Sequence, residues 1–152
     1  MIPADDTTAF ASGTAEDATA QPLDIDGLVR KFQKELNSGL IGLVLLSVLD
    51  HAQEDLYGYQ IAKRLQAISD QGSPMKQGAL YPVLRTLSAH GLLASRVVPS
   101  YAGPPRRYYR ITPAGHETLL RWRATWTGTR DFVDAVARGL AAATDPTRSD
   151  PP

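Results

Sequence analysis

The segment from residue 56 to residue 115 constrains the fold most, because two helical patterns in it are followed by two strand-like ones. Apolar residues recur at the three- and four-residue spacing of an amphipathic helix over residues 57–70 and again over 77–89. Between them, the run Gln71-Gly72-Ser73-Pro74 contains the glycine and proline that commonly end a helix. The sequence therefore predicts two short helices joined by a turn.

A β-hairpin with a basic tip is predicted directly after the second helix. Residues 92–98 and 106–111 have the composition of strands, and the run Tyr101-Ala102-Gly103-Pro104-Pro105 is typical of the turn between them. Two helices followed by such a hairpin form a winged helix-turn-helix, a fold that can place its second helix in the major groove of DNA. We therefore predict a mainly α-helical chain with a small β-hairpin.

An N-terminal helix is predicted to precede this segment. Apolar residues recur every four positions from Leu28 to Leu36, and residues 40–49 are apolar nearly all round, as in a helix that is buried on several sides. The run Asn37-Ser38-Gly39 either interrupts this helix or only weakens it. A polar loop is expected over residues 50–56.

The two ends of the chain are predicted to be disordered tails. Residues 1–22 are rich in Ala, Thr and Asp, and residues 144–152 contain three prolines and no candidate core residue. We therefore expect the winged-helix domain, with its N-terminal helix, to span residues 23–111 and a long C-terminal helix to span residues 112–143.

The predicted C-terminal helix begins with Thr112 as a cap and Pro113 in its first turn. A stripe along it follows alternating steps of three and four residues, the heptad spacing of a helix that packs on another helix. The stripe consists of Leu119, Trp122, Trp126, Thr129, Val133, Val136 and Leu140. Because the winged-helix core is nearly complete without it, we expect the stripe, apart from Thr129, to form a dimer interface. Packing on the chain's own first helix is the alternative.

The net charge of zero conceals an asymmetry along the chain. Residues 1–26 contain six acidic residues and no Lys or Arg, whereas residues 39–111 contain eight basic residues and four acidic ones. The predicted winged-helix domain therefore carries a charge of about +4, and two copies in a dimer would present a positive surface to phosphates.

Several classes of function are disfavoured by what the sequence lacks. There is no cysteine, which excludes disulfides and thiolate metal sites. The run His116-Glu117 lacks the second histidine of a zinc-protease helix, and neither a Gly-rich phosphate loop nor a Gly-x-Ser-x-Gly turn is present. We therefore predict no enzymatic activity, cofactor or metal. Without a long apolar run or a secretory signal, the protein is expected to be cytoplasmic, with no membrane partner.

Five short motifs occur in a specific order: Tyr57-Gly58-Tyr59-Gln60-Ile61, Gly78-Ala79-Leu80-Tyr81-Pro82, Arg85-Thr86-Leu87, Gly91-Leu92 and residues 107–115, RYYRITPAG. As an ordered set they resemble the PadR family of bacterial transcriptional regulators, over roughly residues 36–140. In that family a Gly-Thr-Leu-Tyr-Pro run opens the recognition helix, and here Ala79 replaces the Thr. The long C-terminal helix without a further large domain resembles the compact subgroup of the family.

The pattern of the second helix and the resemblance together indicate a DNA-binding surface. An Arg, an amide and a tyrosine lie near the start of the second helix, where side chains reach base edges and phosphates. The resemblance implies that the first helix contacts the DNA backbone, and the hairpin tip can reach a phosphate or the minor groove. The residues expected to contact DNA are Tyr57, Tyr59, Gln60, Lys63, Lys76, Gln77, Gly78, Ala79, Tyr81, Arg85, Tyr101, Gly103, Arg106 and Arg107. Whether Tyr81 serves DNA binding or the fold is left open.

Trp122 and Trp126 fit two roles. On a dimer interface they can be ordinary core, since large aromatic residues dominate interface energetics. The resemblance implies a second role, because some compact PadR-like regulators bind planar aromatic or hydrophobic molecules between aromatic residues of the dimer interface.

The sequence thus predicts a homodimeric, sequence-specific DNA-binding regulator that binds a double-stranded operator as a repressor and is relieved by a small molecule. The alternative is a winged-helix domain that binds another protein and not DNA. Such a surface would be less basic along Lys76, Arg85, Arg106 and Arg107.

Overall fold

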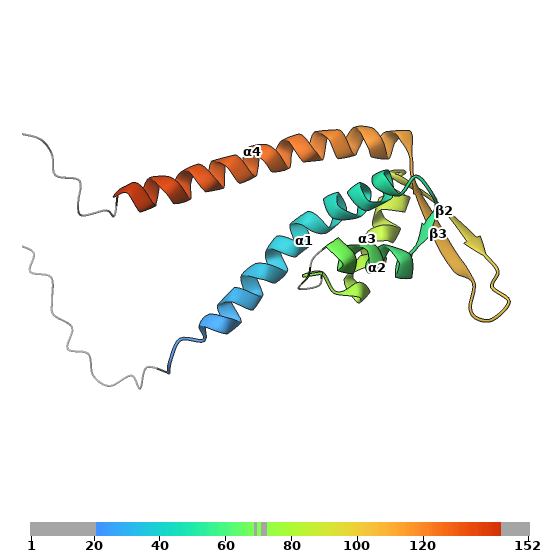
Figure 1. Cartoon of the computed structure of the whole chain (residues 1–152), viewed down its shortest axis with the longest axis horizontal. Helices are drawn as coiled ribbons and strands as arrows, with labels where there is room; N and C mark the ends of the chain where they lie inside the picture. Colours follow the sequence, from blue (N-terminus) through green and yellow to red (C-terminus); the bar gives the residue numbers. More distant parts are fainter. Residues whose placement is uncertain (1–20, 69, 71–72, 144–152) are drawn as a thin grey trace, which may run out of the picture.

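The structure is a computed structural model that describes residues 21–68, 70 and 73–143, and it confirms the predicted fold class (Figure 1). The elements in chain order are α1 (Ile25–Ala52), β1 (Leu56–Tyr57), α2 (Gly58–Ile68), α3 (Gln77–Ala89), β2 (Leu93–Val98), β3 (Arg106–Ile111) and α4 (Pro113–Ala143). The predicted tails lie outside the described residues, apart from Gln21 and Pro22, which precede α1.

The hydrophobic core lies where the C-terminal half of α1 meets α2, α3, the sheet and the first turns of α4. As predicted, α3 turns Leu80, Leu84 and Leu87 towards this core. The largest fully buried side chains are Leu45, Leu46, Leu56, Ile61, Leu80, Leu84 and Leu119. Because every element of the winged-helix region contributes to this one cluster, α3 and the hairpin are held in a defined relation to each other.

The sheet has three antiparallel strands in the order β1-β3-β2, and β1 is an element that the sequence did not predict. Leu56 pairs with Tyr109 and Tyr57 with Tyr108. The predicted loop over 50–56 and the predicted helix start at Tyr57 are therefore wrong at this point. A strand of two residues is too short for a periodic pattern, and its hydrogen-bonding partner lies far along the chain in the hairpin.

Helix α1 is continuous, so the run Asn37-Ser38-Gly39 does not interrupt it. Asp24 caps its start by accepting a hydrogen bond of 2.8 Å from the N–H of Gly27, and Gln53 ends it in the left-handed conformation. Asn37 has a tertiary role, because its side-chain amide donates to the carbonyl oxygen of Pro74 (2.9 Å), just before α3.

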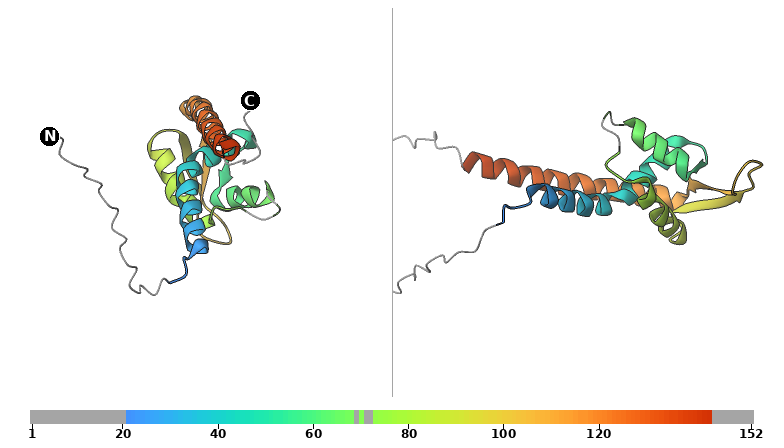
Figure 2. Two further views of the ribbon diagram at one scale, coloured as in Figure 1. Left: turned by 90° about the vertical axis from the view of Figure 1, so that its left-hand side faces the viewer. Right: turned by 90° about the horizontal axis from the view of Figure 1, so that it is seen from below.

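Helices α1 and α4 pack together near the sheet and then diverge (Figure 1). The hairpin projects from the end of the molecule opposite to the diverging ends of α1 and α4, as the right-hand view of Figure 2 shows. At the base of α4, Thr112 caps the helix as predicted, accepting from the N–H of Gly115 at 3.0 Å. Its hydroxyl also donates to the carbonyl of Gly91 (2.7 Å), which ties α4 to the turn after α3.

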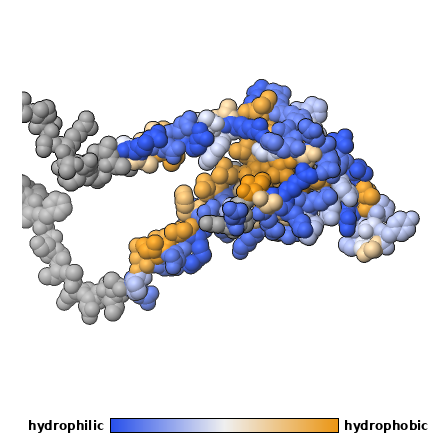
Figure 3. All heavy atoms as spheres, viewed as in Figure 1, coloured by the Kyte–Doolittle hydropathy of each residue, from blue (hydrophilic) through white to orange (hydrophobic). Residues whose placement is uncertain are grey.

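Helix α1 has the length and composition of a membrane-spanning helix, with a mean hydropathy of 1.2 over 18 residues. The sequence prediction rested on uninterrupted apolar runs and did not detect this feature. In the fold, residues from Ile41 to Leu49 belong to the core, whereas the apolar side chains from Leu28 to Leu36 are exposed. Figure 3 shows this exposed apolar surface along the part of α1 that is distant from the sheet. The apolar residues in the C-terminal half of α1 are therefore part of the protein core.

Candidate nucleic-acid interface

The start of α3 is exposed, and most of the DNA contacts predicted for this helix lie there. Lys76, Gln77, Gly78 and Ala79 are exposed, and Arg85 follows two turns later, also exposed. A Cβ atom added at Gly78 would meet no other group within 4 Å. Packing among the described residues therefore does not require this glycine, which leaves room for close approach of a ligand to the helix backbone.

Tyr81 links α3 to α2 and therefore has a role in the fold. Its ring lies against Gly58, the first residue of α2, so closely that a Cβ at Gly58 would collide with the ring. Gly58 is therefore needed for the two helices to approach. Tyr81 still exposes 38% of its surface, so a contact with DNA is sterically open.

A shallow groove of about 320 Å³ lies between α3, the start of α2 and strand β3, which it reaches next to the hairpin turn. Three arginine residues contribute to its lining: Arg85 from α3, and Arg106 and Arg107 from β3. Tyr109 forms part of the floor, and burial raises the pKa of its phenol, which stays protonated at neutral pH. With three arginine residues in its lining, the groove has the charge and the hydrogen-bond donors that an anionic phosphate requires.

The two hairpin arginines at this groove are oriented by different contacts. Arg107 donates to the hydroxyl of Ser95 on the neighbouring strand (3.1 Å). Arg106 lies over the ring of Tyr57, with its guanidinium carbon 4.6 Å from the ring centroid. At the hairpin tip, Tyr101 is fully open to solvent and Gly103 is exposed. The predicted hairpin contacts thus divide into two oriented arginines and an unrestrained tip.

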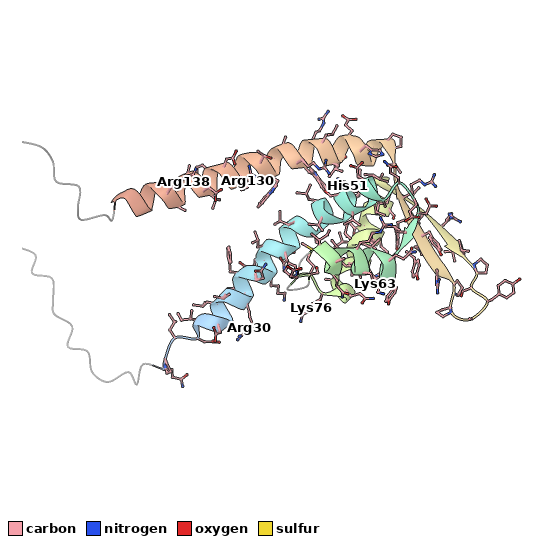
Figure 4. The ribbon with its side chains drawn as sticks, viewed as in Figure 1. Arg30, His51, Lys63, Lys76, Arg130 and Arg138 are labelled. Carbon is pink, nitrogen blue, oxygen red and sulfur yellow. The ribbon has the colours of Figure 1, made fainter. Side chains whose placement is uncertain are left out.

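The predicted contacts at the start of α2 have mixed roles. Tyr57 lies in β1 and is half-buried, with its ring against those of Tyr59 and Tyr108. The side-chain oxygen of Gln60 accepts from the N–H of Tyr57 (3.2 Å), which makes it a local cap for α2. Tyr59 and Lys63 are exposed, with the ammonium group 5.5 Å from the ring centroid. Figure 4 shows Lys63 and Lys76 on the side of the molecule away from α4.

An acidic residue at the base of the hairpin was not identified from the sequence. Asp55 pairs with Arg96 and Arg110. The two guanidinium hydrogen bonds hold the pKa of the Asp55 carboxyl below its ordinary value. No local pattern could reveal this cluster, because its members lie 41 and 55 residues apart in sequence.

The stripe on α4 is divided between core and surface. Leu119 is only 2% exposed and belongs to the protomer core, so it leaves little for a partner to cover. Trp122 packs on α1 at Gly42, where an added Cβ would lie 3.2 Å from the ring, and Trp126 is partly buried. Val133 and Val136 are exposed, and the side chain of Leu140 lies outside the described part of the structure.

Similarity to known proteins agrees with this arrangement. Residues 45–121 match the model of the PadR-like family of transcriptional regulators. The transcriptional regulator Rv3488 of Mycobacterium tuberculosis is 36% identical over 113 residues, which cover 72% of this chain and 87% of that protein. This chain belongs to the PadR-like family.

Two solved structures have a similar fold over nearly all of their own length. The crystal structure of a PadR family transcriptional regulator from Eggerthella lenta has 35% identity and a TM-score of 0.62, covering 74% of this chain and 94% of that one. A transcriptional regulator from Clostridium thermocellum has 27% identity and a TM-score of 0.59, covering 66% and 93%. PadR regulators bind DNA and typically form dimers, and the chain is a transcriptional regulator of this kind and not an enzyme.

Proposed function

We propose that this PadR-like regulator is a homodimeric repressor that binds a two-fold operator through α3 and the hairpin, and that a small molecule relieves repression. The observation that carries this proposal is the convergence of Arg85, Arg106 and Arg107 on one groove beside the exposed start of α3. A cluster of three arginine residues suits the phosphate backbone of DNA better than the surface of a partner protein.

In the proposed complex, the exposed face of α3 enters the major groove of DNA. Arg85 reaches a base edge, and Gln77, which is also exposed, lies about two turns before it. Arg106 and Arg107 contact phosphates beside the major groove of the DNA. Lys76 contacts a further phosphate at the start of α3. The open space at Gly78 favours a phosphate close to the helix backbone.

The test compares two arginine variants with a control. Arg85→Ala should cost about 1–3 kcal/mol of operator binding and relax the preference at one base pair. Arg107→Ala should weaken binding to all duplexes and reduce the salt slope by about one unit. Arg121→Ala, an exposed arginine of α4 that pairs with Glu117, serves as control. If both test variants bind like this control at every salt concentration, the proposed docking is wrong.

The proposed dimer uses the distal part of α4. Val133 and Val136 are exposed there at heptad spacing, together with Phe132. The exposed apolar stripe of α1 lies on the other arm of the same open pair of helices (Figure 3). A second copy would cover this apolar surface and carry a second α3, which suits two half-sites on one duplex.

The proposed effector is a planar aromatic or hydrophobic molecule that stacks on Trp126 in the dimer. In a two-fold dimer, the two Trp126 side chains come from equivalent positions on the partner helices. Indole rings attract flat and cationic molecules. Trp122 is the weaker candidate, because its ring already packs on Gly42. The ligand regulates DNA binding only if it prefers one spacing of the two DNA-binding units over another.

The two tryptophans provide matched variants for testing the effector. Planar cationic dyes are titrated while tryptophan fluorescence and operator binding are followed. Trp122→Phe should keep both the quenching and the release of DNA, whereas Trp126→Phe should lose them. Quenching that persists unchanged in Trp126→Phe would make Trp126 an ordinary interface residue.

A further inference from the structure

We propose that Asp55 is a positioning residue for DNA recognition, which sets the orientation of the hairpin relative to α3. This inference rests on the proposed mode of DNA binding. It gives a role to an acidic side chain that lies within a basic DNA-binding region, where its charge alone would oppose binding.

The position of the carboxylate supports this role. Asp55 immediately precedes β1, at the base of the sheet, and its side chain is only 13% exposed. One oxygen accepts from the Nε of Arg96 on β2 (2.9 Å), and the other accepts from the Nε of Arg110 on β3 (2.5 Å). A single carboxylate therefore joins the segment after α1 to both strands of the hairpin.

A series of contacts extends from this carboxylate towards the hairpin tip. Arg96 lies over the ring of Tyr108, with 5.3 Å between the guanidinium carbon and the ring centroid. Tyr108 packs edge-on against Tyr57 at 5.4 Å, and Tyr57 lies under Arg106. Because strand residues alternate, Arg106, Tyr108 and Arg110 share one face of β3. The series thus connects Asp55 with an arginine of the groove beside α3.

This arrangement distinguishes positioning from simple charge. If Asp55 acted only through its charge, its removal would strengthen binding to every duplex, since one negative charge near the phosphates would be lost. If it positions the hairpin, its removal weakens binding to the specific duplex, where Arg106 and Arg107 must meet defined phosphates together with α3. Binding to other duplexes would then follow charge alone.

The experiment uses a neighbouring acid as a matched control. The parent protein selects a duplex from a random-sequence pool, and a scrambled duplex of the same length and composition serves as the second probe. Dissociation constants are measured for the parent, Asp55→Asn and Glu54→Gln over a range of salt concentrations. Glu54 also lies before β1, but it pairs with Arg64 of α2 and not with the hairpin.

Glu54→Gln should bind both duplexes as tightly as the parent or more tightly. Asp55→Asn should bind the selected duplex about tenfold more weakly, the factor that corresponds to 1.4 kcal/mol. It should bind the scrambled duplex like Glu54→Gln. Equal strengthening on both duplexes by the two variants would overturn the inference. A parent protein that selects no duplex would overturn the proposed function itself.

A second variant covers the case in which Asp55→Asn does not fold, as judged by its thermal unfolding. Arg96→Gln removes one guanidinium group from the carboxylate and one positive charge from the hairpin. Charge alone would weaken both duplexes equally, whereas displacement of the hairpin should weaken the selected duplex further. Equal weakening by Arg96→Gln would therefore overturn the inference.

Discussion

Both halves of α1 carry large apolar side chains, but these side chains have opposite surroundings. In the C-terminal half, Leu45 and Leu46 are completely buried among α2, α3 and the sheet. In the N-terminal half, Leu28 and Phe32 are 53% and 65% exposed. Helix α4 shows the same division, from buried Leu119 to Val133, which is 56% exposed.

The difference indicates that one chain completes the DNA-binding region but not the two long helices. A winged-helix region with its own core can fold within a protomer. The apolar side chains that stay exposed on the two diverging helices support the proposed interface with a second chain. Substitutions at the two ends of each helix should therefore act on different equilibria, folding at one end and association at the other.

The largest effect is expected in the distal part of α4. Val133→Asp combined with Val136→Asp would place two unpaired charges in the proposed interface, at about 3–5 kcal/mol for each charge that stays buried. Light scattering should then show a folded monomer. Leu120→Asp serves as control, because Leu120 is exposed on a different face of the same helix. A double variant that remains a well-folded dimer contradicts the interface.

The next-largest effect is expected when the same substitution, Leu to Ala, is made in each half of α1. Leu45→Ala should lower the free energy of unfolding by about 2–5 kcal/mol, through lost burial and the cavity that remains. Leu28→Ala should mainly change the dimer dissociation constant, so its cost in denaturant titrations should depend on protein concentration. If both variants destabilise the protein equally and independently of concentration, the two halves of α1 do not differ in the proposed way.

Comparison of sequence and structure shows which features local patterns determine. The spacing of Leu80, Leu84 and Leu87 was enough to predict the buried face of α3, and the strand ends in the hairpin followed from composition and turn residues. These features depend on residues within a few positions of one another. The capping role of Thr112 also follows from a local signal and was confirmed.

The features that were missed depend on tertiary contacts. Strand β1 exists because Leu56 and Tyr57 pair with the distant strand β3. The role of Arg110 depends on Asp55, and the packing of Tyr81 depends on the absence of a side chain at Gly58. In each case the role of a residue depends on a contact with a residue that is distant in sequence, so no local pattern predicts it. The predicted DNA contacts at Arg85 and Arg107 remain predictions, supported by their common groove.

The base of α4 should be more sensitive to a methyl group than its distal part. A Cβ at Gly115 would collide with the backbone carbonyl of Leu92, so Gly115→Ala should cost about 1–3 kcal/mol of stability. A Cβ at Gly128 meets nothing within 4 Å, so Gly128→Ala should stabilise the helix by up to about 1 kcal/mol. Thermal unfolding of both variants measures the difference. A neutral Gly115→Ala would show that α4 can move away from Leu92 at little cost.

The smallest expected effect is the pH dependence of the Asp55 cluster, which belongs to the self-contained part of the molecule. Its guanidinium partners lower the pKa of Asp55 in the folded state, whereas in the unfolded chain the value is about 3.9. A lowered pKa contributes stability above the unfolded value, and this contribution is lost as the pH falls through the folded value.

The parent should therefore be more stable than Asp55→Asn at neutral pH, and the gap between them should close as the pH falls below about 4. Denaturant titrations at a constant protein concentration, at several pH values from 7 to 3, measure this gap. Because the cluster lies within one protomer, the pH dependence of the gap should be the same when dimerisation is abolished by Val133→Asp and Val136→Asp. A gap that is independent of pH would show that the ion pairs do not stabilise the folded hairpin. If the stability difference between the parent and Asp55→Asn disappears when the dimer is lost, the Asp55 cluster stabilises the dimer and not the folded protomer.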